Sequence, residues 1–160
     1  YSFMMCQNIE YKEYIKSKWS LVVIGTVVST FLACFIYSFL GVEAVYAVLA
    51  GGLYNIGVNG YLTLWAGAFT KTPVDLDSSK MAFGGKKAFN MKTVLISLPQ
   101  MVLPIALFSL GNYYYSYLIG CLFVGFTGIL GILLKEQVFN LIIKAYKSEK
   151  YSTLKAYKQT

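Results

Sequence analysis

The residue types that usually perform chemistry in enzymes are scarce in this sequence. It contains no histidine, so it has neither a Ser-His-Asp set nor a histidine-ligated metal site. Asp75 and Asp77 are two carboxylates one residue apart, but they follow Pro73, where aspartates commonly form turns and caps. No metal-binding spacing relates the three cysteines, Cys6, Cys34 and Cys121. These observations argue against an enzyme and predict neither a cofactor nor a metal.

A phosphate-binding loop is also excluded. The sequence GGKK at residues 84–87 resembles the end of the P-loop pattern, which requires Gly, four residues, then Gly-Lys-Ser/Thr. Lys80 occupies the position of the first glycine, and Lys87 occupies the position of the hydroxyl residue.

The most distinctive polar residues lie at helical spacing inside an apolar segment. No charged residue occurs from Ala44 to Thr70, yet this segment contains GGLYNIGVNG. Positions four apart in it are small or polar: Ala47, Gly51, Asn55, Asn59, Thr63 and Gly67. Residues at i and i+4 share one helix face, where small residues permit close approach and amides bond across the contact. We expect Asn55 and Asn59 to face protein or a wet cavity, in a packing face, a transport path or a dimer face.

The composition indicates a membrane protein. Hydrophobic residues make up 57% of the chain and charged residues only 13%, against about 25% in soluble domains. The uncharged runs Trp19–Val42 and Ala44–Thr70 each suit one membrane span. The run Thr93–Leu134 would measure about 63 Å as one helix, about twice a bilayer core, and Gly111-Asn112 reads as a turn within it. We therefore predict an all-α protein with four transmembrane helices, at residues 19–42, 44–69, 93–110 and 114–134, and kinks at Pro99 and Pro104.

The lysines predict the topology. All fourteen basic residues are lysines, and they lie before the first span, in the 70–92 loop and after the fourth span. The other two connections have none, so the positive-inside rule places both termini and the 70–92 loop in the cytoplasm. This predicts a multi-pass protein of the cytoplasmic (inner) membrane. Lysines beside spans also explain the net charge of +7 without nucleic acid as a partner.

The two ends of the chain read as helices outside the bilayer core. Residues 1–18 are amphipathic and predict an interfacial helix that leads into Trp19 at the membrane surface. Residues 135–160 alternate lysines with apolar residues and predict a basic helix that leaves the membrane or lies on it. No span contains a charge, which argues against proton coupling.

Several stretches of the sequence resemble known membrane-protein families. The stretch NIEYKEYIKSKWSLVV resembles the segment before the third span of ABC-2 type permeases, with matches at Lys12, Glu13, Tyr14, Ile15 and Lys18. The stretches LYNIGVNGYL, VDLDSSKMAF and EKYSTLKAYKQ resemble the C-terminal part of an uncharacterised bacterial family grouped with these permeases.

The resemblance implies a permease subunit, or a fragment of one, in an ATP-driven transporter that moves an unknown substrate. The four spans would be the third to sixth of six, and Tyr1, which is not an initiating methionine, suggests that the chain begins within a longer protein. A separate ATPase subunit would contact the coupling helix at Tyr1, Ser2, Phe3, Met4 and Met5. The other implied partners are the lipid bilayer and further membrane subunits or a second copy.

Two departures from the permease pattern leave alternatives open. The 70–92 loop is longer than usual, and the last hairpin leaves almost no room for re-entrant half-helices. The alternatives are a non-transporting structural membrane subunit of a larger complex and, third, a stand-alone small carrier.

Overall fold

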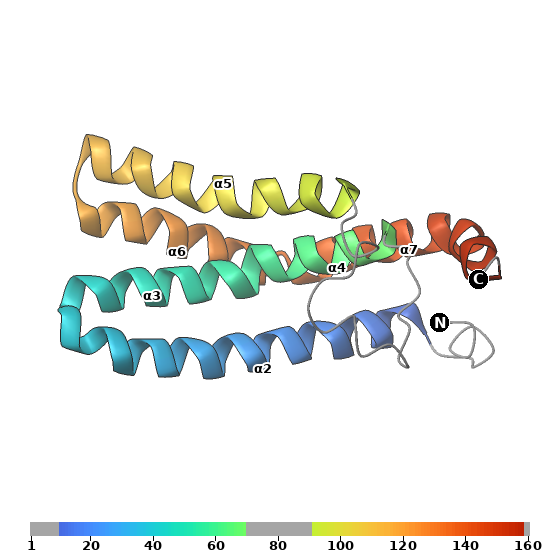
Figure 1. Cartoon of the computed structure of the whole chain (residues 1–160), viewed down its shortest axis with the longest axis horizontal. Helices are drawn as coiled ribbons and strands as arrows, with labels where there is room; N and C mark the ends of the chain where they lie inside the picture. Colours follow the sequence, from blue (N-terminus) through green and yellow to red (C-terminus); the bar gives the residue numbers. More distant parts are fainter. Residues whose placement is uncertain (1–9, 70–90, 159–160) are drawn as a thin grey trace.

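The computed structural model describes residues 10–69 and 91–158, with the side chains of residues 10–69 and 98–149 (Figure 1). All the regular elements within these ranges are helical, which confirms the predicted all-α class. They are α2 (Tyr11–Tyr37), η1 (Ser38–Leu40), α3 (Val42–Tyr54), η2 (Asn55–Asn59), α4 (Gly60–Phe69), α5 (Met91–Tyr114), α6 (Tyr117–Leu133) and α7 (Lys135–Lys158). The predicted contact residues Tyr1, Ser2, Phe3, Met4 and Met5, and most of the 70–92 loop, lie outside the described residues.

Two helical hairpins form the body of the molecule. The first joins α2 to α3 through η1 and Gly41, and the second joins α5 to α6 at Tyr115–Ser116. Gly41 has a φ of 120°, a conformation that only glycine adopts without strain. Helix α6 packs against both α3 and α5 and thereby connects the hairpins. Figure 1 shows both hairpin turns at one end of the molecule, whereas α2 begins and α4 ends at the other end, beside α7.

The second turn does not lie where the sequence predicts it. Gly111-Asn112 was expected to break the run, but α5 continues to Tyr114. A methyl group on Gly111 would lie 2.7 Å from the Cα atom of Gly120 in α6. Gly111 therefore admits the neighbouring helix instead of ending its own helix.

The predicted boundary at Trp19 is not a break in the backbone either. Helix α2 begins at Tyr11 and runs for 27 residues to Tyr37, so the last part of the predicted interfacial segment is continuous with the apolar helix. At the other end of the chain, α7 is bent by 70° from α6. The apolar side of α7 is used for packing, because Phe139 and Ile142 are each only 1% exposed.

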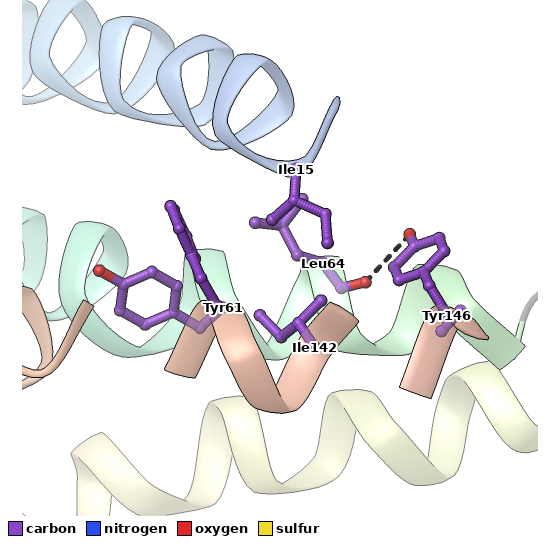
Figure 2. Packing of buried hydrophobic residues seen from close by; sticks show 7 residues of the cluster. Ile15, Tyr61, Leu64, Ile142 and Tyr146 are labelled. Carbon is purple, nitrogen blue, oxygen red and sulfur yellow. Dashed lines mark hydrogen bonds between the residues drawn. The ribbon is translucent and has the colours of Figure 1, made fainter. Parts of the chain in front are cut away.

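Two buried cores hold the helices together. The first core joins α2, α4 and α7 through Ile15, Tyr61, Leu64, Ala68, Phe139, Ile142 and Tyr146. Figure 2 shows the Tyr146 hydroxyl pointing to the backbone of α4, where it donates a hydrogen bond of 3.2 Å to the carbonyl oxygen of Leu64. The second core joins α3 and α6 through Ala50, Tyr54, Cys121 and Val124.

Length and apolarity identify one membrane-spanning candidate among the described residues, the continuous stretch Tyr11–Leu40. A second candidate arises if α6 and Lys135–Glu149, despite their 70° bend, form one span. The apolar window of Tyr11–Leu40 is 0% buried inside the protein, unlike the core helix of a soluble domain. These criteria support one or two spans, which is fewer than the four predicted.

Candidate functional site

The small and polar stripe lies on the continuous helical run formed by α3, η2 and α4. Within it, η2 is a π-helical turn, because the N–H of Gly60 donates to the carbonyl oxygen of Asn55, five residues earlier. Such turns are rare in proteins overall, but those that occur often lie at functional sites. Asn55 and Asn59 are the first and last residues of η2, so the two amides bracket the backbone irregularity.

Three hydrogen bonds connect four polar residues along this face. The Asn59 side-chain nitrogen donates to the Asn55 side-chain oxygen at 2.7 Å, and the Thr63 hydroxyl donates to the backbone carbonyl oxygen of Asn59 at 2.8 Å. Gln100 of α5 donates from Nε2 to the Thr63 hydroxyl at 3.2 Å. We call Asn55, Asn59, Thr63 and Gln100 the polar ladder. The ladder ties α4 to α5 through neutral groups alone.

The other half of the stripe lines an open cavity. Ala47 and Gly51 face a cavity of about 440 Å³ between α3, α5 and α6. The remaining lining is almost entirely apolar: Ala50, Pro104, Ile105, Phe108, Tyr117, Cys121 and Val124. The stripe thus follows one side of α5, as a cavity wall at Gly51 and as a hydrogen-bonded contact at Thr63.

The expected role of Gly51 in close helix approach is wrong. A methyl group there would meet no atom within 4 Å, because Gly51 opens onto the cavity. The close approach occurs at Gly57, where a methyl group would overlap the carbonyl oxygen of Gly128 in α6. A methyl group on Gly131 would likewise overlap the carbonyl oxygen of Gly57. We call Gly57, Gly128 and Gly131 the glycine crossing.

The other predicted features take separate places. Pro99 and Pro104 lie inside α5, which continues through both to Tyr114, and a kink at each remains a prediction. Gly67 leaves room for the Tyr146 hydroxyl, which would lie 2.8 Å from a methyl group at that position. Within the part of the chain that the structure describes, no three His, Cys, Asp or Glu side chains gather in a way that could hold a metal ion.

A second polar cluster, which no sequence pattern predicts, lies where α2 and α7 begin. Lys12 forms an ion pair with Glu136 at 2.9 Å, and the Lys135 ammonium lies 4.2 Å from the centre of the Trp19 ring. The hydrogen bond and charge of Lys12, with smaller effects of Lys135 and Lys16, lower the pKa of the Glu136 carboxyl. We call Lys12, Lys16, Lys135 and Glu136 the α2–α7 junction. No sequence pattern links these residues, because the fold alone brings the two segments together.

The fold and the ladder define an all-helical protein with at least one helix suited to crossing a membrane, and with a neutral polar site beside an open cavity. The chain belongs to the family of unknown function DUF5687, whose model matches residues 1–160. Neither a curated protein nor a solved structure matches the chain.

Proposed function

We propose that the chain crosses the cytoplasmic membrane four times and serves as a permease subunit of an ATP-driven ABC-2 type transporter. The structural observation that supports the proposal is the neutral polar ladder at η2, which lies beside an open cavity and against α5. Amides are costly in hydrocarbon unless they are hydrogen-bonded, so a chain with this apolar exterior keeps them for packing or for a path.

The position of Trp19 supports the membrane arrangement. Trp19 contacts Lys135 and stacks on Tyr61 at a centroid distance of 6.1 Å, so α2, α4 and the start of α7 meet at one level. Tryptophan and lysine are typical of the membrane–water interface. From that level to the hairpin turns, Trp19–Leu40 measures about 33 Å and Val42–Tyr61 about 30 Å, close to a bilayer core. Large side chains along these helices are exposed, with Phe31 at 75%.

This arrangement shortens the predicted second span. Three segments then lie on the cytoplasmic side, packed around the first core: residues 62–69 of α4, the first turns of α2 and the first turns of α7. Asn59 would lie about 3 Å and Asn55 about 9 Å inside the interface, at 1.5 Å per residue. The amides therefore occupy the cytoplasmic third of the bilayer, where water is close.

The permease assignment rests on the resemblance. The matching residues Lys12, Glu13, Tyr14 and Ile15 form the beginning of α2, which the proposed topology puts at the cytoplasmic surface, as the family pattern requires. Because GGKK at residues 84–87 does not complete a P-loop pattern, the proposal assigns ATP hydrolysis to a separate subunit.

Single cysteines test the topology. In a background without Cys6, Cys34 and Cys121, cysteine at Glu43 or Tyr115 should react with an impermeant thiol reagent added to intact cells. Cysteine at Lys147 should react only after the membrane is opened. Labelling of Lys147→Cys in intact cells would refute the four-span arrangement.

Reconstitution tests the transport role. Where the genome encodes an ATPase subunit beside this protein, the full chain is placed in proteoliposomes with that ATPase, and ATP hydrolysis is measured with and without the membrane subunit. We expect stimulation, and we expect Asn59→Leu to reduce it while the thermal unfolding temperature is retained. Ser29→Leu is the matched control, because Ser29 is exposed and bonds only to Thr26 in its own helix. Absence of stimulation by the parent chain would reject the permease assignment.

The hydrogen bonds of the ladder also favour a second candidate, a structural subunit of a membrane complex. The bond from Gln100 to Thr63 joins α5 to α4, as an internal packing role requires. Gln100→Leu removes the only ladder bond between two separate helical runs. Interhelical hydrogen bonds in membranes average about 0.6 kcal/mol, so a structural role predicts a small stability loss with no change in ATPase stimulation. A permease role predicts a clear loss of stimulation instead.

A further inference from the structure

The α2–α7 junction brings three ammonium groups and one carboxylate together. Lys12 and Lys16 are one helical turn apart on α2, while Lys135 and Glu136 begin α7. The pair of Lys12 and Glu136 is accessible, with side chains 53% and 66% exposed. Three ammonium groups against one carboxylate give the junction a net positive charge, and neither Lys16 nor Lys135 forms an ion pair with a described residue.

The first core fixes this arrangement. Ile15, just before Lys16, is 0% exposed, and it shares the first core with Phe139, one helical turn after Lys135. Lys135 is further held over the rings of Trp19 and Phe139, at 4.2 and 5.6 Å from their centres. Packing therefore holds the Lys135 ammonium in place and fixes the backbone from which Lys16 projects, which distinguishes this cluster from lysines scattered on an exposed helix.

The depth of the cluster identifies its ligand. On the proposed membrane arrangement, the contact between Trp19 and Lys135 lies at the cytoplasmic interface. Lysines at this depth extend their apolar stems along the protein and place their charges among the phosphates of the inner leaflet. A zwitterionic headgroup offers these charges no net attraction, whereas an anionic one does.

We propose that the α2–α7 junction is a binding site for the headgroup of an anionic phospholipid of the cytoplasmic leaflet. Lys16 and Lys135 contact the phosphate, and Glu136 weakens binding because it neutralises Lys12. Glu136 therefore lowers the affinity for the headgroup, whereas the lysines around it raise that affinity.

Trp19 provides the assay. The protein has two tryptophans, so Trp65→Phe leaves Trp19, beside Lys135, as the only one. The full chain in phosphatidylcholine bicelles is titrated with phosphatidylglycerol while Trp19 emission is followed, and native mass spectrometry counts the retained phosphatidylglycerol. We expect saturable binding that Lys16→Gln weakens about fivefold and Glu136→Gln strengthens about fivefold. Lys135→Gln should also weaken binding, and this variant is measured by native mass spectrometry alone, because Lys135 contacts the Trp19 ring that gives the fluorescence signal.

The controls separate a built site from general charge. Lys144→Gln removes the same charge from an exposed position on α7 outside the junction, and should leave binding unchanged. Equal losses in Lys144→Gln and Lys16→Gln, or weaker binding in Glu136→Gln, would overturn the proposal. Saturation of the same signal by inorganic phosphate would also overturn it, because the ligand would then be a free anion.

A separate measurement tests the membrane arrangement on which the site depends. The parent chain should float with vesicles of phosphatidylcholine alone, since its apolar helices need no anionic lipid. Failure of the parent chain to float would reject the membrane arrangement. If the parent floats but the lysine substitutions leave phosphatidylglycerol binding unchanged, only the lipid site is rejected.

Discussion

Replacing Gly57 by alanine should separate η2 from α6, while alanine at Gly51 in α3 should not disturb the packing of α6. Both glycines lie in the same helical run, six residues apart, and both substitutions add one methyl group. At Gly57 the methyl group would overlap the carbonyl oxygen of Gly128 and lie 2.7 Å from its carbonyl carbon. Because those atoms are backbone, relief requires movement of the whole of α6. At Gly51 the methyl group enters the cavity.

The difference between the two variants isolates the steric effect. Each alanine gains about 1 kcal/mol of helix propensity over glycine, and this gain cancels in the comparison. Overpacking of a fitted interior costs about 1–3 kcal/mol, and contact with backbone favours the upper end. At about 2–4 °C per kcal/mol for a chain of this size, Gly57→Ala should unfold roughly 6–12 °C below Gly51→Ala.

Thermal unfolding of the purified chain in detergent measures this difference. Gly131→Ala provides an internal check, because its methyl group would overlap the carbonyl oxygen of Gly57 at the same crossing. Once one methyl group has parted the helices the second has room, so the double variant should lose less than the sum. Equal unfolding temperatures for Gly57→Ala and Gly51→Ala would refute the glycine crossing.

The remaining predictions concern the first core, the first turn and the ion pair. Tyr146→Phe removes the hydrogen bond to the Leu64 carbonyl oxygen and should cost about 1 kcal/mol by thermal unfolding, so an unchanged value would show that the bond contributes nothing. Gly41→Ala forces a side chain to a φ of 120° and should cost about 1–3 kcal/mol, measured in the same way. The lowered pKa of Glu136 means that its pair with Lys12 contributes stability above the ordinary carboxyl range, and that this contribution is lost as pH falls through the lowered pKa. The unfolding temperatures of the parent and Lys12→Gln should therefore converge in acid, and a gap that persists there would contradict this linkage.

Apolar patterning was enough to predict the fold class and the two hairpins. Long uncharged runs must be helical in an apolar environment, because a helix satisfies its own backbone groups. Patterning was not enough to place the second turn, since Gly111 reads as a turn residue and acts as a packing residue. Glycine has the same sequence signature in both roles, and only the presence of Gly120 opposite it distinguishes them.

The polar stripe was predictable as a line of residues but not as a packing surface. Spacing of four brings Asn55, Asn59 and Thr63 together, and the structure links them by hydrogen bonds. The same spacing pointed to Gly51, whereas the close contact belongs to Gly57, six residues further along and on another face. Spacing shows which residues share a face but not which face meets another helix, and only the position of α6 opposite Gly57 decides that.

The π-helical turn also bears on how the chain tolerates changes in length. Because η2 bonds five residues apart where an ordinary turn bonds four apart, it contains one residue more than the regular helix needs. Deleting one residue between Asn55 and Asn59 should convert it into a regular turn, with α3 and α4 keeping their orientations. A deletion elsewhere in the same run should instead rotate everything beyond it by about 100° and misalign the first core. Length variants among homologous chains should therefore collect at η2, where the loss of a residue changes the backbone but not the faces on either side.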